Sequence, residues 1–223
     1  MNWTPFYITF KLALITSLVL FIISIPLAYW LAYSKNKFKF IVEALVSMPI
    51  VLPPSVLGFY LLIALGNDGF IGGTVKSIFD VNLAFTFTGL IIGSVIYSLP
   101  FMVQPIQNGF EALPSSLKEA SYTLGKNRWT TLTKVLLPCI KPALLTGTVL
   151  SFAHTIGEFG VVLMIGGNLE ETRVASIAIY DSVNRMDYDS AYTYSFILLL
   201  FSFVILSLVY LVTKKGFNAF GKK

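Results

Sequence analysis

The sequence predicts an all-α membrane protein with about five transmembrane helices. Of its 223 residues, 56% are hydrophobic and 12% are charged, whereas a soluble domain carries about 25% charged residues. The apolar residues gather in long runs, each near or above the ~20 residues that a membrane-spanning helix needs. The predicted spans are about 10–33, 41–65, 84–106, 140–165 and 191–212, within one transmembrane domain that occupies residues 1–223.

Composition also argues against several functional classes. Cys139 is the only cysteine, so no disulfide can form within the chain. The sequence contains no metal-ligand spacing, phosphate-binding loop or dinucleotide motif. We therefore expect no metal, cofactor or nucleotide on this chain. The net charge of +5 is typical of cytoplasmic loops in membrane proteins, so we expect contact with lipid and none with nucleic acid.

The loops differ in charge, and this difference predicts the orientation. Cationic residues follow the first span, fill the loop of residues 111–138 and end the chain, whereas the other loops carry most of the acidic residues. Because Lys and Arg favour the cytoplasmic side, the basic loops and the C-terminus are predicted inside. Five spans then put the N-terminus outside.

The second predicted span, 41–65, is interrupted by prolines. Pro49, Pro53 and Pro54 lack a backbone donor, so the helix must kink or break there. Broken backbone at membrane depth is tolerated where protein or a water-filled cavity covers it. We favour a helix that lines a path, with Pro53, Pro54 and Ser55 at its break; the alternative is a kink used only for packing.

The polar loop of residues 111–138 reads as two short helices. Pro114 and the serines after it mark a helix start, and Ser116 and Glu119 have the spacing of a capping box. Gly125 stands where a C-terminal glycine belongs, and Asn127 is a cap for a second helix. An apolar stripe on the first helix consists of Leu113, Leu117, Ala120 and Leu124. The pattern alone leaves open whether the stripe lies on lipid headgroups or docks in a groove of another protein.

This loop resembles the signature of the permease subunits of bacterial ABC importers, E-A-A, three residues, G, nine residues, I-x-L-P. Here the chain reads Glu119-Ala120-Ser121, then Gly125, then Val135-Leu136-Leu137-Pro138, with every spacing kept. Ser121 and Val135 are mild departures. Further segments, including residues 26–38, 43–72, 154–168 and 171–181, are similar to the molybdate-type branch of that family.

The resemblance implies that the loop forms a cytoplasmic coupling helix that sits in a cleft of a separate ATPase. It implies a complex in the cytoplasmic membrane, with two copies of this chain, two ATPase subunits and an extracytoplasmic binding protein. The chain itself would be non-catalytic, and ATP and Mg would bind the partner ATPase. The expected coupling residues are Leu117, Glu119, Ala120, Ser121, Leu124, Gly125, Val135, Leu137 and Pro138.

The cargo expected from this resemblance is molybdate, a tetrahedral dianion. A path for an oxyanion offers hydroxyls and backbone donors and avoids carboxylates at its narrow point. The fourth span, 140–165, supplies Thr146, Thr148, Ser151, His154 and Thr155. Tungstate and sulfate share the charge and shape of molybdate, so both remain alternatives.

His154 and Glu158 are ionisable groups within the fourth span, and such groups are costly there and often functional. At a spacing of four residues they would share one helix face and interact. We favour a pair that satisfies itself at the outer membrane border and fixes helix packing. The alternative is that the two residues help to close an outer gate.

The acidic outer loop after the fourth span is a candidate docking surface for the binding protein, with Glu170, Glu171 and Arg173 as its central residues. A solvated loop without a partner is the plainer interpretation. Two rival functions for the whole chain are an intramembrane enzyme that uses His154 and Glu158, and an ungated anion channel. The enzyme lacks a nucleophile or metal set, and the coupling signature argues against the channel.

Overall fold

The computed structural model describes residues 2–220, and the surroundings of side chains up to residue 207. Within that range the chain is helical with short connections and contains no strand, as the composition predicts. The elements are α1 (Thr4–Tyr33), α2 (Lys39–Val51), α3 (Pro54–Leu65), α4 (Phe70–Phe79), α5 (Phe87–Glu111), α6 (Ser115–Thr123), α7 (Arg128–Thr131), the π-helical turn η1 (Leu132–Leu136), α8 (Leu137–Cys139), α9 (Lys141–Gly157), α10 (Gly160–Gly166), α11 (Ala175–Asn184) and α12 (Tyr188–Phe220).

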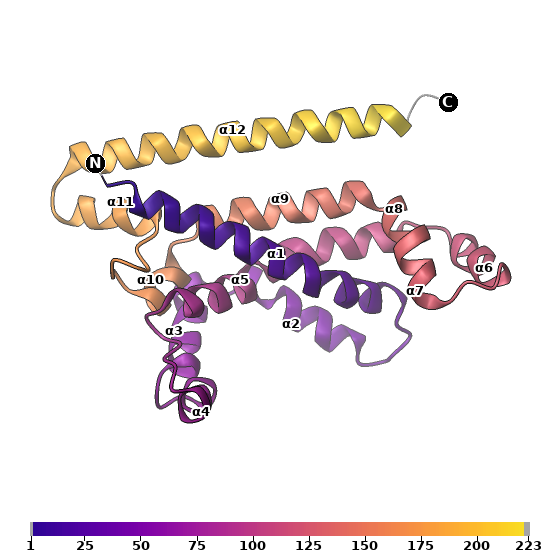
Figure 1. Ribbon diagram of the computed structural model, residues 1–223, viewed down its shortest axis with the longest axis horizontal. Coiled ribbons are helices and arrows are strands. Elements are labelled where there is room, and N and C mark those ends of the chain that lie inside the picture. Colours follow the sequence, from indigo (N-terminus) through magenta and orange to yellow (C-terminus); the bar gives the residue numbers. More distant parts are fainter. Residues whose placement is uncertain (1, 221–223) are drawn as a thin grey trace.

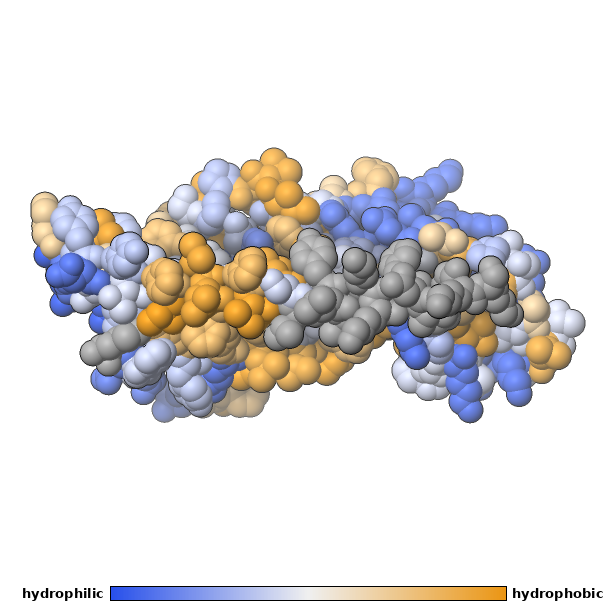
Figure 2. Space-filling model, turned by 90° about the horizontal axis from the view of Figure 1, so that it is seen from above, coloured by the Kyte–Doolittle hydropathy of each residue, from blue (hydrophilic) through white to orange (hydrophobic). Residues whose placement is uncertain are grey.

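The longest helices run along the long axis of the molecule (Figure 1). Helices α1, α5 and α9 pack against one another in the centre, and α12 lies along one side. The α6–α7 loop lies at one end, and the first residues of the chain, α10 and α11 lie toward the other end. On the face seen in Figure 2, apolar side chains gather in the middle of this axis and hydrophilic ones at both ends. A bilayer would therefore be crossed along the long axis.

Four helical stretches of the described chain are long and apolar enough to span a membrane, or five if one bent pair counts as a span. These stretches overlap all five predicted spans, but two of those spans are not continuous. The stretches are Thr4–Tyr33, Pro54–Phe79, Phe87–Glu111 and Tyr188–Ser207, and the bent pair is Arg128–Cys139 with Lys141–Gly157.

The first discontinuity has a local cause in the sequence, and the second has none that the sequence shows. In the predicted span 41–65, helix α2 ends at Val51 and α3 begins at Pro54, because Pro53 and Pro54 offer no backbone donor. In the predicted span 140–165, α9 ends at Gly157, and Glu158 adopts extended backbone angles before α10 begins. The sequence did not predict this second break.

The loop at the α6–α7 end is built largely as its sequence indicates. Gly125 has a φ of +72°, and the amides of Gly125 and Lys126 bond back to the carbonyls of Tyr122 and Ser121, which is a Schellman motif. Asn127 caps α7 by accepting a hydrogen bond from the amide of Thr130. Both predictions are confirmed.

The predicted capping box of Ser116 and Glu119 is wrong. Helix α6 begins at Ser115, so Pro114 takes the N-cap position and no side chain caps the helix. Ser116 therefore already lies within the first turn, where its hydroxyl is not in the position of an N-cap acceptor.

Candidate functional site

The two helix breaks meet at a cavity. Its volume is about 540 Å³, and its walls come from the start of α3, the middle of α5 and the junction of α9 with α10. Four of the residues predicted for the path lie in this wall or at its edge: Pro54, Ser55, His154 and Glu158. Tyr97 of α5 lines the same cavity. The structure thus brings together residues about 100 positions apart in the sequence.

Close backbone contact holds the two breaks together. A β-carbon added to Gly160 would stand 2.6 Å from the β-carbon of Pro54. One turn further along α3, a β-carbon on Gly58 would stand 2.9 Å from the β-carbon of Met164 and 3.1 Å from the backbone of Val161. Small residues let membrane helices approach closely, and here they let α10 lie directly against α3.

Glu158 lies at the second break and binds two neighbouring helices. Its side chain is only 4% exposed, and one carboxylate oxygen accepts a hydrogen bond of 3.2 Å from Ser94 of α5. Its backbone carbonyl accepts a second bond, of 2.6 Å, from Ser176 of α11. The other carboxylate oxygen, Oε1, is buried without a partner among the described atoms. Glu158 therefore connects α9 to both α5 and α11.

A second group of hydrogen bonds lies one helical turn away. Ser98 of α5 contacts Nδ1 of His154 and the hydroxyl of Thr155, each at 3.0 Å. The ring of His154 stacks on Phe101 at 4.0 Å and lies 4.7 Å from the ring of Tyr97. Two serines of α5, four residues apart, thus bind the end of α9.

The predicted contact between His154 and Glu158 is wrong, since no hydrogen bond or ion pair joins them within residues 2–220. The expectation assumed a continuous helix, but α9 ends before Glu158 and its backbone turns away. Each side chain bonds instead to a serine of α5. Glu158 is buried within the protein, and its place near the outer membrane border stays a prediction.

The remaining path candidates do not reach the cavity. The hydroxyls of Thr146, Thr148 and Ser151 each bond a carbonyl of their own helix. Thr155 is buried beside Ser98 and does not line the cavity; its hydroxyl also donates to the carbonyl of Ser151. Pro53 flanks the first break as the N-cap of α3.

The coupling-loop candidates form two groups. Val135, Leu137 and the neighbouring Leu136 pack into a core with α1 and α5, so the η1 turn anchors the loop to the membrane helices. Pro138 lies at the start of α8. Ser121 is buried, and its hydroxyl bonds Thr131 at 2.9 Å, which joins α6 to α7.

The other group lies at the surface of the same loop. Leu124 is 76% exposed and Trp129 is 72% exposed. Glu119, Ala120 and Gly125 are also exposed, and Leu117 is partly buried. The structure thus leaves the end of the apolar stripe of α6 without cover on the described chain.

The outer-loop candidates are not equivalent. Glu170 and Glu171 are exposed, but Arg173 binds Asp181 of α11 at 2.6 Å, and Arg185 binds the other oxygen of the same carboxylate at 3.1 Å. Arg173 thus holds the loop against α11.

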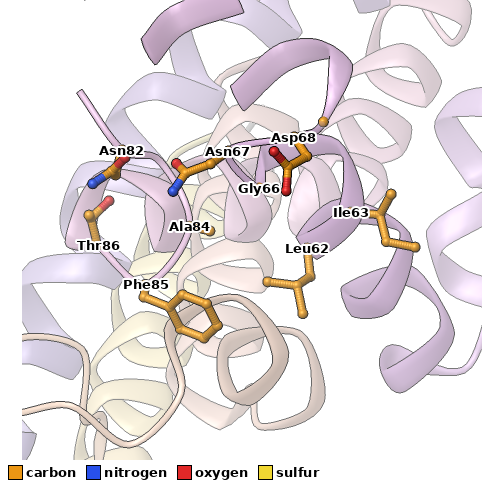
Figure 3. A pocket seen from close by; sticks show the side chains of 10 residues that line it. Leu62, Ile63, Gly66, Asn67, Asp68, Asn82, Ala84, Phe85 and Thr86 are labelled. Carbon is orange, nitrogen blue, oxygen red and sulfur yellow. The ribbon is translucent and has the colours of Figure 1, made fainter. Parts of the chain in front are cut away.

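A hollow of about 670 Å³ lies between the turn after α3 and the segment before α5 (Figure 3). Asn67, Asp68 and Asn82 bring polar groups to it, and Leu62 and Phe85 supply an apolar wall. No residue that the sequence predicted for a site lines it.

Sequence reasoning missed the partners on α5 and α11, namely Ser94, Ser98, Tyr97, Phe101 and Ser176. A signal was present for two of them. Ser94 and Ser98 are small polar residues four apart within an apolar span, so they share one helix face.

Comparison with known proteins decides the family. The family described as "Binding-protein-dependent transport system inner membrane component" matches residues 24–216. The chain belongs to this family. Its members are permeases of transport systems, so the chain is a non-catalytic, multi-pass subunit in the cytoplasmic membrane, as its sequence indicates.

Two relatives illustrate the similarity. The molybdenum transport system permease protein ModB of Azotobacter vinelandii is 45% identical over 204 residues, which cover 91% of this chain and 90% of the relative. The sulfate transport system permease protein CysT of Escherichia coli (strain K12) is 32% identical over 202 residues, covering 88% of this chain and 73% of the relative.

Solved structures support the fold. A bacterial ABC transporter involved in the import of alginate matches with a TM-score of 0.79 and 19% identity, covering 95% of this chain and 78% of that chain. The MetNI methionine ABC transporter in an inward-facing conformation matches with a TM-score of 0.73 and 16% identity, covering 95% and 94%. The helical arrangement is thus that of ABC transporter permeases.

The bond between Ser94 and Glu158 yields a stability prediction. Ser94→Ala and Glu158→Met, each alone and together, should show a coupling free energy of about 1 kcal/mol, because either change removes the same buried hydrogen bond. The measurement is thermal or denaturant unfolding of the purified chain in detergent.

Ser24→Ala serves as the matched control, because the buried hydroxyl of Ser24 has no hydrogen-bond partner in the described part of the chain. The effect of Ser24→Ala should add to that of Glu158→Met. If the effect of Ser94→Ala also simply added to that of the change at Glu158, the Ser94–Glu158 bond would contribute nothing to stability.

Proposed function

We propose that this chain is the permease subunit of an ATP-driven importer that moves molybdate into the cell. The observation that carries the proposal is the cavity at the two helix breaks, on a chain 45% identical to a molybdenum permease. Two copies of the chain would pair, each above one ATPase subunit, and an extracytoplasmic protein would deliver the anion. ATP and Mg would bind the ATPase, and this chain would carry no cofactor.

The chemistry of the cavity suits an oxyanion. Ser55 and Gly157 are exposed there, and His154 and Tyr97 are partly exposed, so hydroxyl, imidazole and backbone groups face the hollow. Glu158 is buried and bound by Ser94, which withdraws the carboxyl from the open surface. Neutral polar groups can replace part of the hydration shell of an anion as it passes.

The position of this cavity supports the proposed pairing of two copies. Irregular backbone at membrane depth must be covered by protein or by water. In a single chain the cavity opens to the side, where Ser55 and Gly157 are exposed. A second copy facing it would enclose a central path between the two cavities.

We propose that contacts within this chain connect the ATPase to the path. A displacement of α6 and α7 would act on η1, which packs with α1 and α5. The chain then bends by 77° into α9, whose far end holds Glu158 and the start of α10. Closure of the ATPases would thus favour one of two arrangements of α10 against α3, which is alternating access. In the proposed transporter, α6 and the C-terminus face the cytoplasm and the N-terminus faces outward.

Sulfate is the second candidate cargo, because CysT sulfate permeases are 32–35% identical to this chain. Tungstate shares the size class and charge of molybdate and would share its path. The binding protein would make the choice among these anions.

Uptake of labelled molybdate tests the proposed cargo. Cells without their own high-affinity system would express the chain with its ATPase and binding protein. We expect ATP-dependent uptake that excess tungstate blocks and excess sulfate does not. Uptake of sulfate in place of molybdate would contradict the cargo and keep the importer.

Leu124→Asp tests the coupling surface. Because Leu124 is exposed, the change should leave folding intact, but a charge in an apolar docking cleft should lower uptake at least about tenfold and loosen its coupling to ATP hydrolysis. The control is Ser115→Asp, at the exposed first residue of α6, where it should leave uptake near normal. Normal uptake with Leu124→Asp, or equal losses in both variants, would contradict the assignment.

A further inference from the structure

A hollow of about 340 Å³ lies where the last turn of α1 meets α6 and α7. Its walls carry four aromatic rings and two cationic side chains: Tyr29, Trp30, Tyr33, Tyr122, Lys118 and Arg128. All the charged residues in its lining are cationic. Such a lining favours an anionic group.

The two cationic side chains, Lys118 and Arg128, are free to bind an anionic group. In the described part of the chain, neither Lys118 nor Arg128 forms an ion pair, whereas the nearby Glu111 pairs with Lys39. The Lys118 ammonium lies over Tyr33 at 4.2 Å and near Tyr29 at 5.6 Å. These contacts position its charge at the aromatic wall without neutralising it.

The hollow lies at the end of a predicted membrane span. Tyr29, Trp30 and Tyr33 belong to the end of a 30-residue apolar helix, and a basic segment follows directly. Trp30 is 40% exposed. Exposed Trp and Tyr at the end of a span are typical of the headgroup level, where their rings contact both acyl chains and water.

We infer that this hollow binds the phosphate of an anionic lipid headgroup. The two cations would contact the phosphate, and the aromatic wall would contact the glycerol and upper acyl region. A free oxyanion would use the cations but leave the aromatic wall without a partner, so the lipid uses the site more fully.

The hollow joins three helices, so a lipid bound there would link them. Lys118 lies on α6 and Arg128 begins α7, whereas the aromatic wall belongs to α1. One bound headgroup would therefore connect the membrane helix to the proposed coupling loop. This inference does not depend on which anion the transporter carries.

Quenching of Trp30 fluorescence tests the site. The full chain, with Trp3→Phe and Trp129→Phe so that Trp30 is the remaining tryptophan, would be reconstituted into phosphatidylcholine vesicles. Brominated phosphatidylglycerol would then be added and compared with brominated phosphatidylcholine. We expect stronger quenching by the anionic lipid, and about a tenfold higher half-quenching concentration with Lys118→Gln and Arg128→Gln combined.

The matched control removes the same charge from the same loop. Lys126→Gln with Lys134→Gln changes two exposed cations outside the hollow and should shift quenching less than about twofold. Lys118→Arg with Arg128→Lys keeps both charges and should keep the preference, which separates charge loss from misfolding.

Three results would overturn the inference. Equal shifts in the site and control variants would indicate general surface potential only. Relief of quenching by excess inorganic phosphate would indicate a site for free anions. Loss of lipid preference on adding the ATPase subunit would indicate that an acidic protein surface occupies the hollow.

Discussion

Interrupted helices inside a membrane impose the constraint on which this structure depends. A backbone group freed by a helix break has no water to bind at that depth, so the protein itself must satisfy it. At the first break, the carbonyl of Pro53 accepts the amides of Val56 and Leu57. At the second break, Ser176 donates to the carbonyl of Glu158. The Pro53 carbonyl is thus satisfied within α3 itself, and the Glu158 carbonyl by a neighbouring helix.

This constraint also explains why the two breaks lie together. Gly160 and Gly58 let α10 approach α3 closely, so each interrupted span covers part of the other. Ser94 and Ser98 bind the end of α9 from the intact helix α5. A rigid helix thus faces two interrupted ones, and the cavity forms between them. Of these three walls, the interrupted ones can be displaced with the least loss of backbone hydrogen bonding.

Local sequence rules predicted the parts whose cause is local. Gly125 and Asn127 sit where a helix end and a cap require them, and the adjacent Pro53 and Pro54 separate α2 from α3. A single proline is not sufficient for a break, because Pro49 lies inside α2. No proline marks the break at Glu158 in the sequence. Its cause is tertiary, because bonds from α5 and α11 hold Glu158 in place. For the same reason the four-residue spacing of His154 and Glu158 wrongly predicted a contact between them, since that rule holds only within a continuous helix.

The cavity at the two breaks is the proposed path of the anion. Cysteine labelling in the assembled transporter tests it most directly, with Ser55→Cys at the cavity and Tyr60→Cys on the exposed side of the same helix, both in a Cys139→Ser background. A negatively charged thiol reagent should label Ser55→Cys and stop uptake, excess transported anion should slow that labelling, and Tyr60→Cys should keep its uptake. Normal uptake after complete labelling of Ser55→Cys would contradict the account.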